Sequence, residues 1–369
     1  MSKHGRVLVA MSGGIDSTVT AAMLHHEGYE VVGITMKTWD YATSGGSKKE
    51  TGCCSLDSIN DARSVAVDLD FAHYIIDIRD EFGNWVIDDF VQEYLAGRTP
   101  NPCVMCNTHI KWAALLRRAN ALDCEFIATG HYAQIRQLND SKRFVVSKGL
   151  DENKDQSYVL WGLDQACLAR TMFPVGGFQK PHIRQMAADW GYHELAKKAE
   201  SYEICFIPDN DYRGFLSRRV EGLSEMVSDG NFVSSEGKVL GKHLGYPFYT
   251  VGQRKGLGIA LGKPMFVTQI IPETNTIVLG EQEELLRNGM LVRKLNMQKY
   301  ADAFDGIQTT TKIRSRHEGA PARIVQESAD TMRVFFDEYV ESIAPGQSAV
   351  FYENNDVIGG GHISQSFLY

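Results

Sequence analysis

The first 130 residues alternate between short apolar-rich runs and longer stretches whose apolar residues recur at helical spacing. The apolar runs, bounded by polar and glycine positions, predict strands at residues 7–9, 31–36, 73–78 and 126–129. Apolar positions three or four apart predict helices at residues 17–27, 57–68, 82–94 and 110–121. This alternation of strand and helix predicts an α/β fold, a doubly wound parallel sheet covered by helices.

The pattern changes to alternation with period two after about residue 280. Strands are predicted at residues 290–295, 309–316, 322–326, 331–336, 348–352 and 357–361. Short strands separated by turn residues indicate a small β-barrel. The chain is also too long for one compact core, which predicts two or three domains, and the change of pattern favours three. They are an α/β domain at 1–210, a small glycine-rich central domain at 211–278 and a C-terminal β-barrel domain at 279–369.

A glycine-rich stretch with the sequence Ala-Met-Ser-Gly-Gly-Ile-Asp-Ser lies at Ala10–Ser17, between the first predicted strand and the first predicted helix. Its glycines let backbone N–H groups approach phosphate oxygens, and the start of the helix adds partial positive charge. Ser12 and Ser17 can donate hydroxyl hydrogen bonds, and Asp16 can orient water or magnesium. The stretch lacks the lysine of GxxxxGK[ST] and does not fit GxGxxG. It resembles the SGGxDS pyrophosphate loop of the N-type ATP pyrophosphatases, which split ATP into AMP and pyrophosphate.

Ligands of doubly wound sheets bind beyond the carboxyl ends of the strands. Met36 and Gly130 stand at the ends of two predicted strands, and the stretch from Ser12 to Ser17 follows a third. We therefore expect these residues to lie together and to contact a nucleotide.

The amino-acid composition indicates which classes of protein this chain can belong to. The chain has 369 residues, of which 43% are hydrophobic and 23% charged, as in a globular protein. Its apolar runs are too short to span a bilayer, and glycines interrupt the first one early, so we expect no membrane segment, no signal peptide and a cytoplasmic location. Seven cysteines favour free, metal-bound or catalytic thiols over a disulfide framework. A net charge of −8 argues against a general nucleic-acid coat but permits local basic patches for one RNA.

Two cysteines precede a predicted helix in the sequence Asn-Pro-Cys-Val-Met-Cys-Asn, which runs from Asn101 and contains Cys103 and Cys106. A thiol at the start of a helix has a lowered pKa and is more often a thiolate. Cys205 lies far along the chain in the sequence Ile-Cys-Phe-Ile. Cys106 and Cys205 could form a sulfur-handling pair near the nucleotide, or both could be small buried hydrophobic residues. Cys124 and Cys167 have apolar neighbours and are expected to be structural.

The order of these motifs resembles that of bacterial tRNA-specific 2-thiouridylases, over nearly the whole chain. The stretches that carry the resemblance are Ser12–Ser17, Gly33–Met36, Asn101–Asn107, Ala128–Tyr132, Lys154–Tyr158, Ile204–Ile207, Gly252–Gly258, Lys312–Arg314 and Pro345–Gln347. Each motif alone is weak, but the ordered set is specific. The resemblance implies an adenine nucleotide alpha hydrolase-like catalytic domain, a central tRNA-binding domain and a β-barrel.

The family inserts sulfur at C2 of the wobble uridine, position 34, in tRNAs for Lys, Glu and Gln. The resemblance implies that ATP, with Mg²⁺, adenylates the C2 oxygen and that pyrophosphate and then AMP leave. It also implies that Cys205 carries a persulfide received from a donor protein, either a cysteine desulfurase or a relay protein. Cys106 would be the partner nucleophile, which attacks either the persulfide or the activated base. A disulfide between the two cysteines would then need reduction.

The resemblance also assigns binding residues. It implies that ATP is bound by Ala10, Met11, Ser12, Gly13, Gly14, Ile15, Asp16, Ser17, Met36 and Gly130. It implies that tRNA is bound by Asn101, Pro102, Cys103, His131, Lys154, Asp155, Gln156, Arg314, Ser315 and Gln347. Reaching C2 would require the uridine to be flipped out of its stack.

Two positions depart from the family pattern. Cys103 stands where the family often has Asp, so the proton-transfer role of that Asp is in doubt here, and the thiol could contact the base or act as a resolving thiol. Ser315 stands where an aromatic residue is common, which puts a stacking contact in doubt.

Other interpretations remain open at this stage. Cys103, Cys106 and Cys205, with Cys53 and Cys54, could hold an iron–sulfur cluster or zinc, although no second CxxC follows, and we favour no metal. A different pyrophosphatase-loop enzyme, making an amide or guanidinium product, would need none of these thiols. A tRNA-binding adaptor with an inactive nucleotide loop would not convert ATP to AMP.

Overall fold

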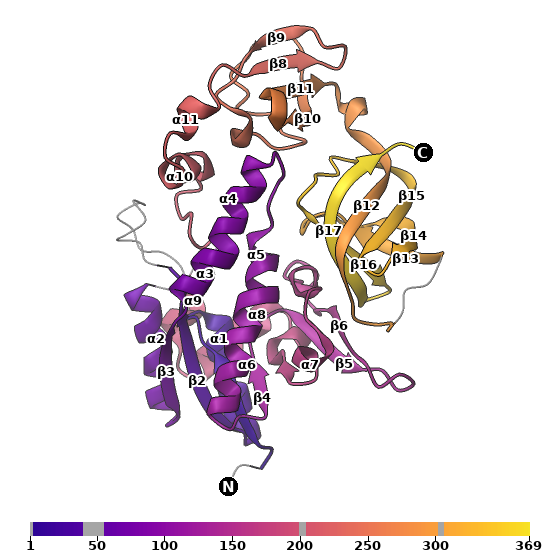
Figure 1. The fold of residues 1–369 in the computed structure, drawn as a ribbon. Coiled ribbons are helices and arrows are strands. Elements are labelled where there is room, and N and C mark those ends of the chain that lie inside the picture. Colours follow the sequence, from indigo (N-terminus) through magenta and orange to yellow (C-terminus); the bar gives the residue numbers. More distant parts are fainter. Residues whose placement is uncertain (1–2, 40–54, 199–203, 302–305) are drawn as a thin grey trace. The chain divides into compact units, whose positions relative to one another are not determined.

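The computed structural model describes residues 3–39, 55–198, 204–301 and 306–369. Most of the loop expected at 38–53, together with Cys53 and Cys54, lies outside the described residues. The chain divides into two compact units. Figure 1 labels the helices and strands and colours the chain by sequence, from indigo to yellow. Unit 1 comprises residues 1–86, 103–211 and 355–357, and unit 2 comprises residues 87–102, 212–354 and 358–369. The predicted domain boundaries after residues 210 and 278 stay predictions.

Unit 1 is built on a parallel sheet with the strand order β3-β2-β1-β4-β7. The strands are β1 (Arg6–Ala10), β2 (Glu30–Lys37), β3 (Ala72–Asp77), β4 (Phe126–Ala128) and β7 (Thr171–Met172). The first four match the predicted strands, and the parallel sheet with its helices confirms the predicted doubly wound fold. Its central strands are nearly continuous in apolar residues because helices cover both faces.

Helices α1 (Ile15–Glu27) and α2 (Leu56–Asp68) pack on one face of this sheet. Val7 and Val9 of β1 join the core that these two helices close. Side chains alternate along a strand, so the intervening buried Leu8 points to the other face. Helix α6 (Trp112–Ala121) packs against β1 and β4.

Two predicted helices are interrupted by π-helical turns. The stretch predicted at 82–94 consists of α3 (Arg79–Phe82), the π turn η1 (Gly83–Ile87) and α4 (Asp88–Leu95). The stretch that ends with α6 starts with α5 (Pro102–Met105) and the π turn η2 (Cys106–Lys111). π turns are rare and occur often at functional sites.

The remaining elements of unit 1 follow β4. They are β5 (Ala133–Gln137), β6 (Phe144–Lys148), η3 (Ser157–Leu160), α7 (Gln165–Leu168), η4 (Pro174–Gly177), α8 (Lys180–Asp189) and α9 (His193–Lys197). Strands β5 and β6 form an antiparallel hairpin, and α8 packs against α1 and α9.

Unit 2 contains α10 (Tyr212–Arg219), α11 (Leu223–Met226) and a four-stranded sheet with the order β10-β11-β8-β9. Its strands are β8 (Asn231–Ser234), β9 (Val239–Lys242), β10 (Phe266–Ile271) and β11 (Thr276–Gly280). Short 3₁₀ turns lie at Tyr246–Phe248, Pro272–Thr274 and Gln282–Leu285.

The C-terminal β-barrel is confirmed. Within the described ranges it has six strands, and the pairing of β12 with β17 closes it. The strands are β12 (Leu286–Met297), β13 (Ile307–Lys312), β14 (Ala320–Ser328), β15 (Thr331–Glu341), β16 (Ser348–Glu353) and β17 (Asp356–Phe367). The strand predicted at 309–316 ends earlier, at Lys312, because the exposed residues 314–316 break the period of two and form a turn. Among the described residues, no helix has the length and apolar character needed to cross a membrane.

His243 gives unit 2 a dependence on pH. Its ring is buried, Nδ1 accepts a hydrogen bond from the Gly245 N–H at 3.0 Å, and Nε2 lies 3.2 Å from the Asn275 carbonyl. Burial lowers the pKa of His243 to about 4. The unfolded chain therefore takes up a proton near pH 6.5 that the folded chain takes up only near pH 4, so folding stability falls as the pH drops through this window.

We expect the folded chain to lose up to about 3 kcal/mol between pH 6.5 and pH 4 from this residue. The measurement is the melting temperature as a function of pH for the full chain and for His243→Gln. The variant should be less stable at pH 7.5, because the ring packs on Phe232 and Tyr249, but its loss on acidification should be smaller. Parallel pH profiles for the two proteins would contradict the assignment.

Candidate active site

The glycine-rich stretch forms the turn between β1 and α1. Ser17 Oγ accepts a hydrogen bond from the Ser12 N–H at 3.1 Å and donates one to the Gly14 carbonyl at 3.0 Å. Gly14 is the N-cap of α1 and gives the helix no side-chain cap. The first N–H groups of a helix need partners from outside it, and together they favour an anion. The turn therefore has the donor geometry of a phosphate cradle.

Gly13 can be only glycine in this turn. Its φ is +69°, and a Cβ built on it would lie 1.9 Å from the carbonyl oxygen of Ser58 in α2. Gly14 differs, since its φ is −98° and a Cβ there would meet nothing closer than Ser12 Oγ at 3.5 Å. The close packing of α2 against the turn thus excludes a side chain at position 13 but not at position 14.

Gly13→Ala is therefore expected to destabilise the chain by about 2–4 kcal/mol, from the left-handed backbone and the clash together, and to abolish ATP binding. Gly14→Ala is the matched control and should change the melting temperature little. Differential scanning fluorimetry of both variants, with and without ATP, provides the measurement. Equal melting temperatures for the two variants would show that α2 moves aside without cost.

The structure places the other predicted nucleotide contacts beside the turn. A Cβ on Gly130 would lie 2.8 Å from the carbonyl carbon of Asp16 and 2.9 Å from the Ser17 nitrogen, so the backbone after β4 abuts the start of α1. Ala10 pairs with Ile34 of β2, and the strand carries Met36 to the same edge of the sheet. The ATP-binding role of these residues remains a proposal.

Asp16 is held by two residues that our sequence reasoning did not assign. Lys180 Nζ lies 2.7 Å and 2.8 Å from the two carboxylate oxygens, and Tyr132 Oη donates to one of them at 2.7 Å. Lys180 is only 6% exposed. The Asp16 carboxylate is thus neutralised within the protein and oriented at the first turn of α1.

A signal for Lys180 exists in the sequence. Lysine is unfavourable at the start of a helix because the helix dipole is positive there. Lys180 is the first residue of α8 and precedes Pro181, which marks a helix start. A lysine at that position points to a compensating partner, although the sequence does not identify Asp16.

The two cysteine segments both pack on α3. Cys106 opens η2, and η2 packs against α3. Cys205 is exposed, and the next residue, Phe206, packs on Phe82 of α3 with ring centroids 5.8 Å apart. Phe206 also contacts Trp39, two residues beyond β2, at 6.1 Å. These contacts hold both segments near the carboxyl edge of the sheet in unit 1.

The pKa of the Cys103 thiol differs from the value expected for a thiol at the start of a helix. Part of the Cys103 side chain reaches the surface, but many protein atoms lie around its thiol. The resulting desolvation raises the pKa of the thiol, while the positive charge of Lys111 acts in the opposite direction. The expectation of a lowered pKa was therefore wrong for Cys103. Desolvation outweighs the opposing charge of Lys111 at this thiol.

His131 lies in an aromatic environment. Its Nδ1 is 2.7 Å from Thr129 Oγ1, and its ring contacts Trp112 and Phe173. Burial, assisted by Lys111, lowers the pKa of His131 well below its usual value. The ring is neutral at pH 7, so a contact with RNA would be a hydrogen bond or a stack rather than an ion pair.

The predicted tRNA residues at 154–156 form a tight loop. Asp155 accepts hydrogen bonds from the N–H groups of Gly149 and Ser157, each at 3.1 Å. Gln156 Oε1 accepts from the Tyr132 N–H at 2.9 Å. The side chains of Asp155 and Gln156 therefore shape the loop that carries Lys154.

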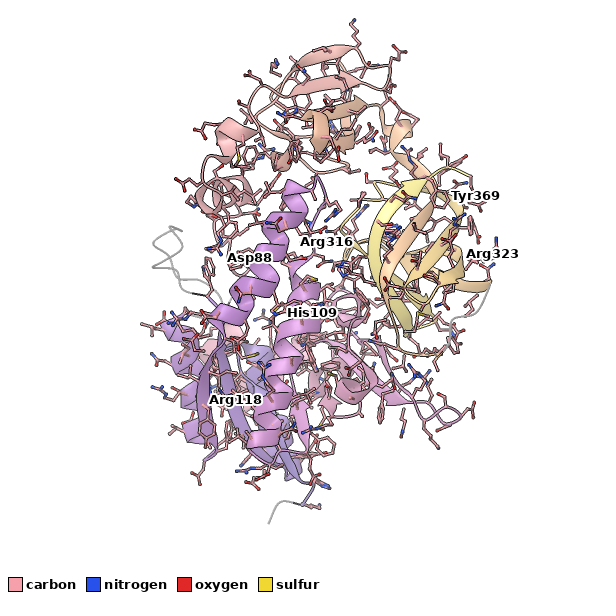
Figure 2. The ribbon with its side chains drawn as sticks, viewed as in Figure 1. Asp88, His109, Arg118, Arg316, Arg323 and Tyr369 are labelled. Carbon is pink, nitrogen blue, oxygen red and sulfur yellow. The ribbon has the colours of Figure 1, made fainter. Side chains whose placement is uncertain are left out.

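The remaining predicted tRNA residues belong to unit 2. Gln347 Nε2 donates to the carbonyls of Thr99 and Pro100, at 3.2 Å and 2.8 Å, directly before Asn101 and Pro102. The structure therefore brings Gln347 and the 101–102 segment together. Arg314 and Ser315 are exposed in the turn after β13, in the part of unit 2 where Figure 2 labels Arg316.

Comparison with known proteins identifies the family. The profile of the tRNA methyl transferase HUP domain matches residues 5–209, that of the tRNA methyl transferase PRC-barrel domain residues 215–281, and that of the aminomethyltransferase beta-barrel domain residues 287–363. The tRNA-specific 2-thiouridylase MnmA of Cytophaga hutchinsonii is 66% identical over 100% of this chain and 99% of its own. The chain belongs to the tRNA-specific 2-thiouridylase family.

Other relatives agree. The 2-thiouridylases MnmA of Amoebophilus asiaticus and Salinibacter ruber are 63% and 57% identical, each over 99% of this chain and 96% of their own. A solved 4-thiouridine synthetase–RNA complex with bound ATP aligns at a TM-score of 0.35 and 15% identity, over 58% of this chain and 50% of that chain. That likeness is too low to indicate a shared function.

The parts of the chain that the structure describes contain no cluster of metal-ligating side chains. No group of three or more His, Cys, Asp or Glu side chains there lies close enough to hold an ion. Asp16, the carboxylate that could have oriented magnesium, is engaged at both oxygens by Lys180.

Proposed function

We propose that this chain thiolates C2 of the wobble uridine, position 34, in tRNAs for Lys, Glu and Gln. As a member of the 2-thiouridylase family, the chain is a tRNA uridine sulfurtransferase that uses ATP. The observation that carries the finer proposal is the meeting of three parts in unit 1. The turn before α1 follows β1 at the carboxyl edge of the parallel sheet, and the Cys106 and Cys205 segments both pack on α3, which follows β3 at the same edge.

The first step is adenylation. The C2 oxygen of the uridine attacks the α-phosphorus of ATP, the bond between that phosphorus and the bridging oxygen breaks, and pyrophosphate leaves. The N–H groups at the start of α1 stabilise the charge of the leaving pyrophosphate. We assign Mg²⁺ to the phosphates of ATP, as part of the substrate.

The second step is sulfur transfer. Cys205 carries the persulfide, and its terminal sulfur becomes bonded to C2 while the bond from C2 to the AMP oxygen breaks. Cys106 attacks the inner sulfur of Cys205, which releases the terminal sulfur either before or after it reaches C2. Both orders yield 2-thiouridine, AMP and a Cys106–Cys205 disulfide, which a thiol reductant returns to two thiols with two electrons.

The persulfide comes from a donor protein, a cysteine desulfurase or a relay protein that carries a persulfide itself. The exposure of Cys205 supports such an exchange, because a donor must reach the thiol. We place the reaction in the cytoplasm, because the tRNA substrate is found there. Lys154 and Arg314 would contact phosphates and position the anticodon stem-loop.

The test is mass spectrometry of nucleosides from unmodified tRNA after incubation with the chain, ATP, magnesium and a persulfide-loaded cysteine desulfurase. The expected product is 2-thiouridine at position 34, with one AMP formed for each sulfur. Thiolation at another position, or AMP formation without any sulfur in the tRNA, would overturn the proposal. If the chain were a pyrophosphatase-loop enzyme of another type, replacing Cys106 and Cys205 by serine would leave its activity unchanged.

A further inference from the structure

Lys198 lies beside the glycine-rich turn, outside the residues that the resemblance assigns to ATP or tRNA. Its Nζ is 3.4 Å from the carbonyl oxygen of Gly13, in the middle of the turn, and 2.7 Å from one carboxylate oxygen of Asp61. The Lys198 side chain is 40% exposed, so its ammonium group is accessible from solvent. The turn therefore has a full positive charge in contact with its own backbone.

The fold fixes the backbone of Lys198. Lys198 is the C-cap residue of α9, and its N–H donates to the Leu195 carbonyl at 3.2 Å. The Leu195 side chain is buried in the same core as Ala21 of α1 and Ala62 of α2, so α9 packs with the two helices that flank the turn (Figure 1). The ammonium group thus extends from an anchored element, and only the lysine side chain is free to rotate.

Asp61 holds the ammonium group at the turn. It lies on α2, three residues after Ser58, whose carbonyl oxygen packs against Gly13. The Asp61 side chain is 36% exposed, and ion pairs between side chains this accessible contribute little to stability. Lys198 can therefore exchange Asp61 for a more highly charged partner at small cost.

The chemistry of the turn calls for such a cation. P-loops contain a lysine that reaches the β- and γ-phosphates, but the stretch from Ser12 to Ser17 contains none. The start of α1 supplies only a partial positive charge, whereas pyrophosphate carries several negative charges. Lys180 does not fill this role, because both oxygens of Asp16 hold its ammonium group. Lys198 is placed to supply the missing charge from a distant part of the sequence.

We propose that Lys198 binds the pyrophosphate part of ATP. When ATP occupies the turn, the Lys198 ammonium group leaves Asp61 and pairs with an oxygen of the β- or γ-phosphate. The four-carbon stem of lysine is flexible, so this exchange requires rotation of the side chain and no movement of α9. The inference rests on the proposed function, in that the turn holds the phosphates of ATP. It adds a binding residue that lies outside the glycine-rich motif.

The first test measures nucleotide binding by calorimetry, with the full chain and magnesium but without tRNA, so that no adenylation occurs. Lys198→Met should weaken the binding of ATP and of pyrophosphate about tenfold to 100-fold, because one charge-assisted contact is lost. AMP lacks the β- and γ-phosphates, so its affinity should change less than about twofold. Lys197→Met is the matched control, because the neighbouring Lys197 is 74% exposed and pairs with Glu194.

The second test separates phosphate binding from a structural role of the ion pair. Asp61→Asn removes the carboxylate that competes for Lys198, so ATP should bind this variant about two- to fivefold more tightly. If the pair only held α2 against the turn, Asp61→Asn and Lys198→Met would weaken ATP binding alike. Lys198→Arg keeps the charge and should retain most of the affinity for ATP.

The outcomes separate this inference from the proposed function. A wild-type chain that binds ATP and pyrophosphate, with Lys198→Met binding both as tightly, would overturn the role of Lys198 alone. Equal losses for AMP and ATP, or weaker ATP binding by Asp61→Asn, would also contradict it. A wild-type chain that binds neither ATP nor pyrophosphate would overturn the proposed adenylation itself. Melting temperatures without nucleotide, together with Lys198→Arg, distinguish a lost phosphate contact from a lost fold.

Discussion

Cys205→Ser is expected to reduce tRNA thiolation at least ~1,000-fold, because a serine oxygen cannot carry a persulfide. Adenylation precedes sulfur transfer in the proposed sequence and does not use this thiol. The variant should therefore still bind tRNA and ATP and should accumulate tRNA that carries AMP. Thiolation is measured as 2-thiouridine by mass spectrometry, and the intermediate as label from ATP labelled at the α-phosphate.

Cys167→Ser is the matched control for this prediction. Burial, followed by Asp164, raises the pKa of Cys167 to about 12, so its thiol stays protonated and is a poor nucleophile. That variant should thiolate tRNA at the wild-type rate. Full activity of Cys205→Ser, with the persulfide supplied by the desulfurase, would remove Cys205 from the mechanism.

Lys180→Met should have the second largest effect. Methionine matches the length of the lysine stem but leaves the Asp16 carboxylate without its ion pair beside the phosphate cradle. Breaking a buried pair costs several kcal/mol, and because Asp16 is itself 31% exposed we expect a loss of about 2–3 kcal/mol in the free energy of unfolding. Formation of AMP should fall at least ~100-fold, because the start of α1 is no longer held in place. The measurements are the melting temperature and the release of pyrophosphate in the presence of tRNA.

Two further variants give this prediction its controls. Lys197→Met removes a lysine that is 74% exposed and pairs with Glu194 on the surface, so it should change neither quantity appreciably. Combining Lys180→Met with Asp16→Asn removes both charges and should restore part of the stability but not the activity. A double variant that regains activity would show that the pair is structural only.

The elements that depend on local pattern were predictable from the sequence. Continuous apolar runs gave the central strands, and period two gave the barrel, because each reflects which faces are covered. The π turns were not predictable in this way. One inserted residue in η1 or η2 leaves the apolar spacing on both sides helical, so the interruption is invisible in the sequence pattern.

The site divides in the same way. The turn at Ser12–Ser17 is formed by consecutive residues, so it can be recognised in the sequence as a motif. Lys180 is 164 residues away from Asp16, and only the packing of α8 against α1 joins them. The raised pKa of Cys103 depends on the protein atoms that surround it, which a helix-terminus argument from sequence omits.

The π turn η2 also fixes the direction in which Cys106 faces. Each residue of an α-helix advances the chain by about 100° around the axis, so an added residue rotates everything before it relative to everything after it. Trp112 and Leu115 of α6 are buried, so the extra residue in η2 changes the direction of the Cys106 thiol relative to that helix. A deletion of one residue within Cys106–Lys111 would turn the Cys106 sulfur by roughly a quarter of a circle relative to α6, together with the buried side chains of Val104 and Met105. The rotation of this helix about its axis therefore decides where the thiol that we propose as a nucleophile can reach.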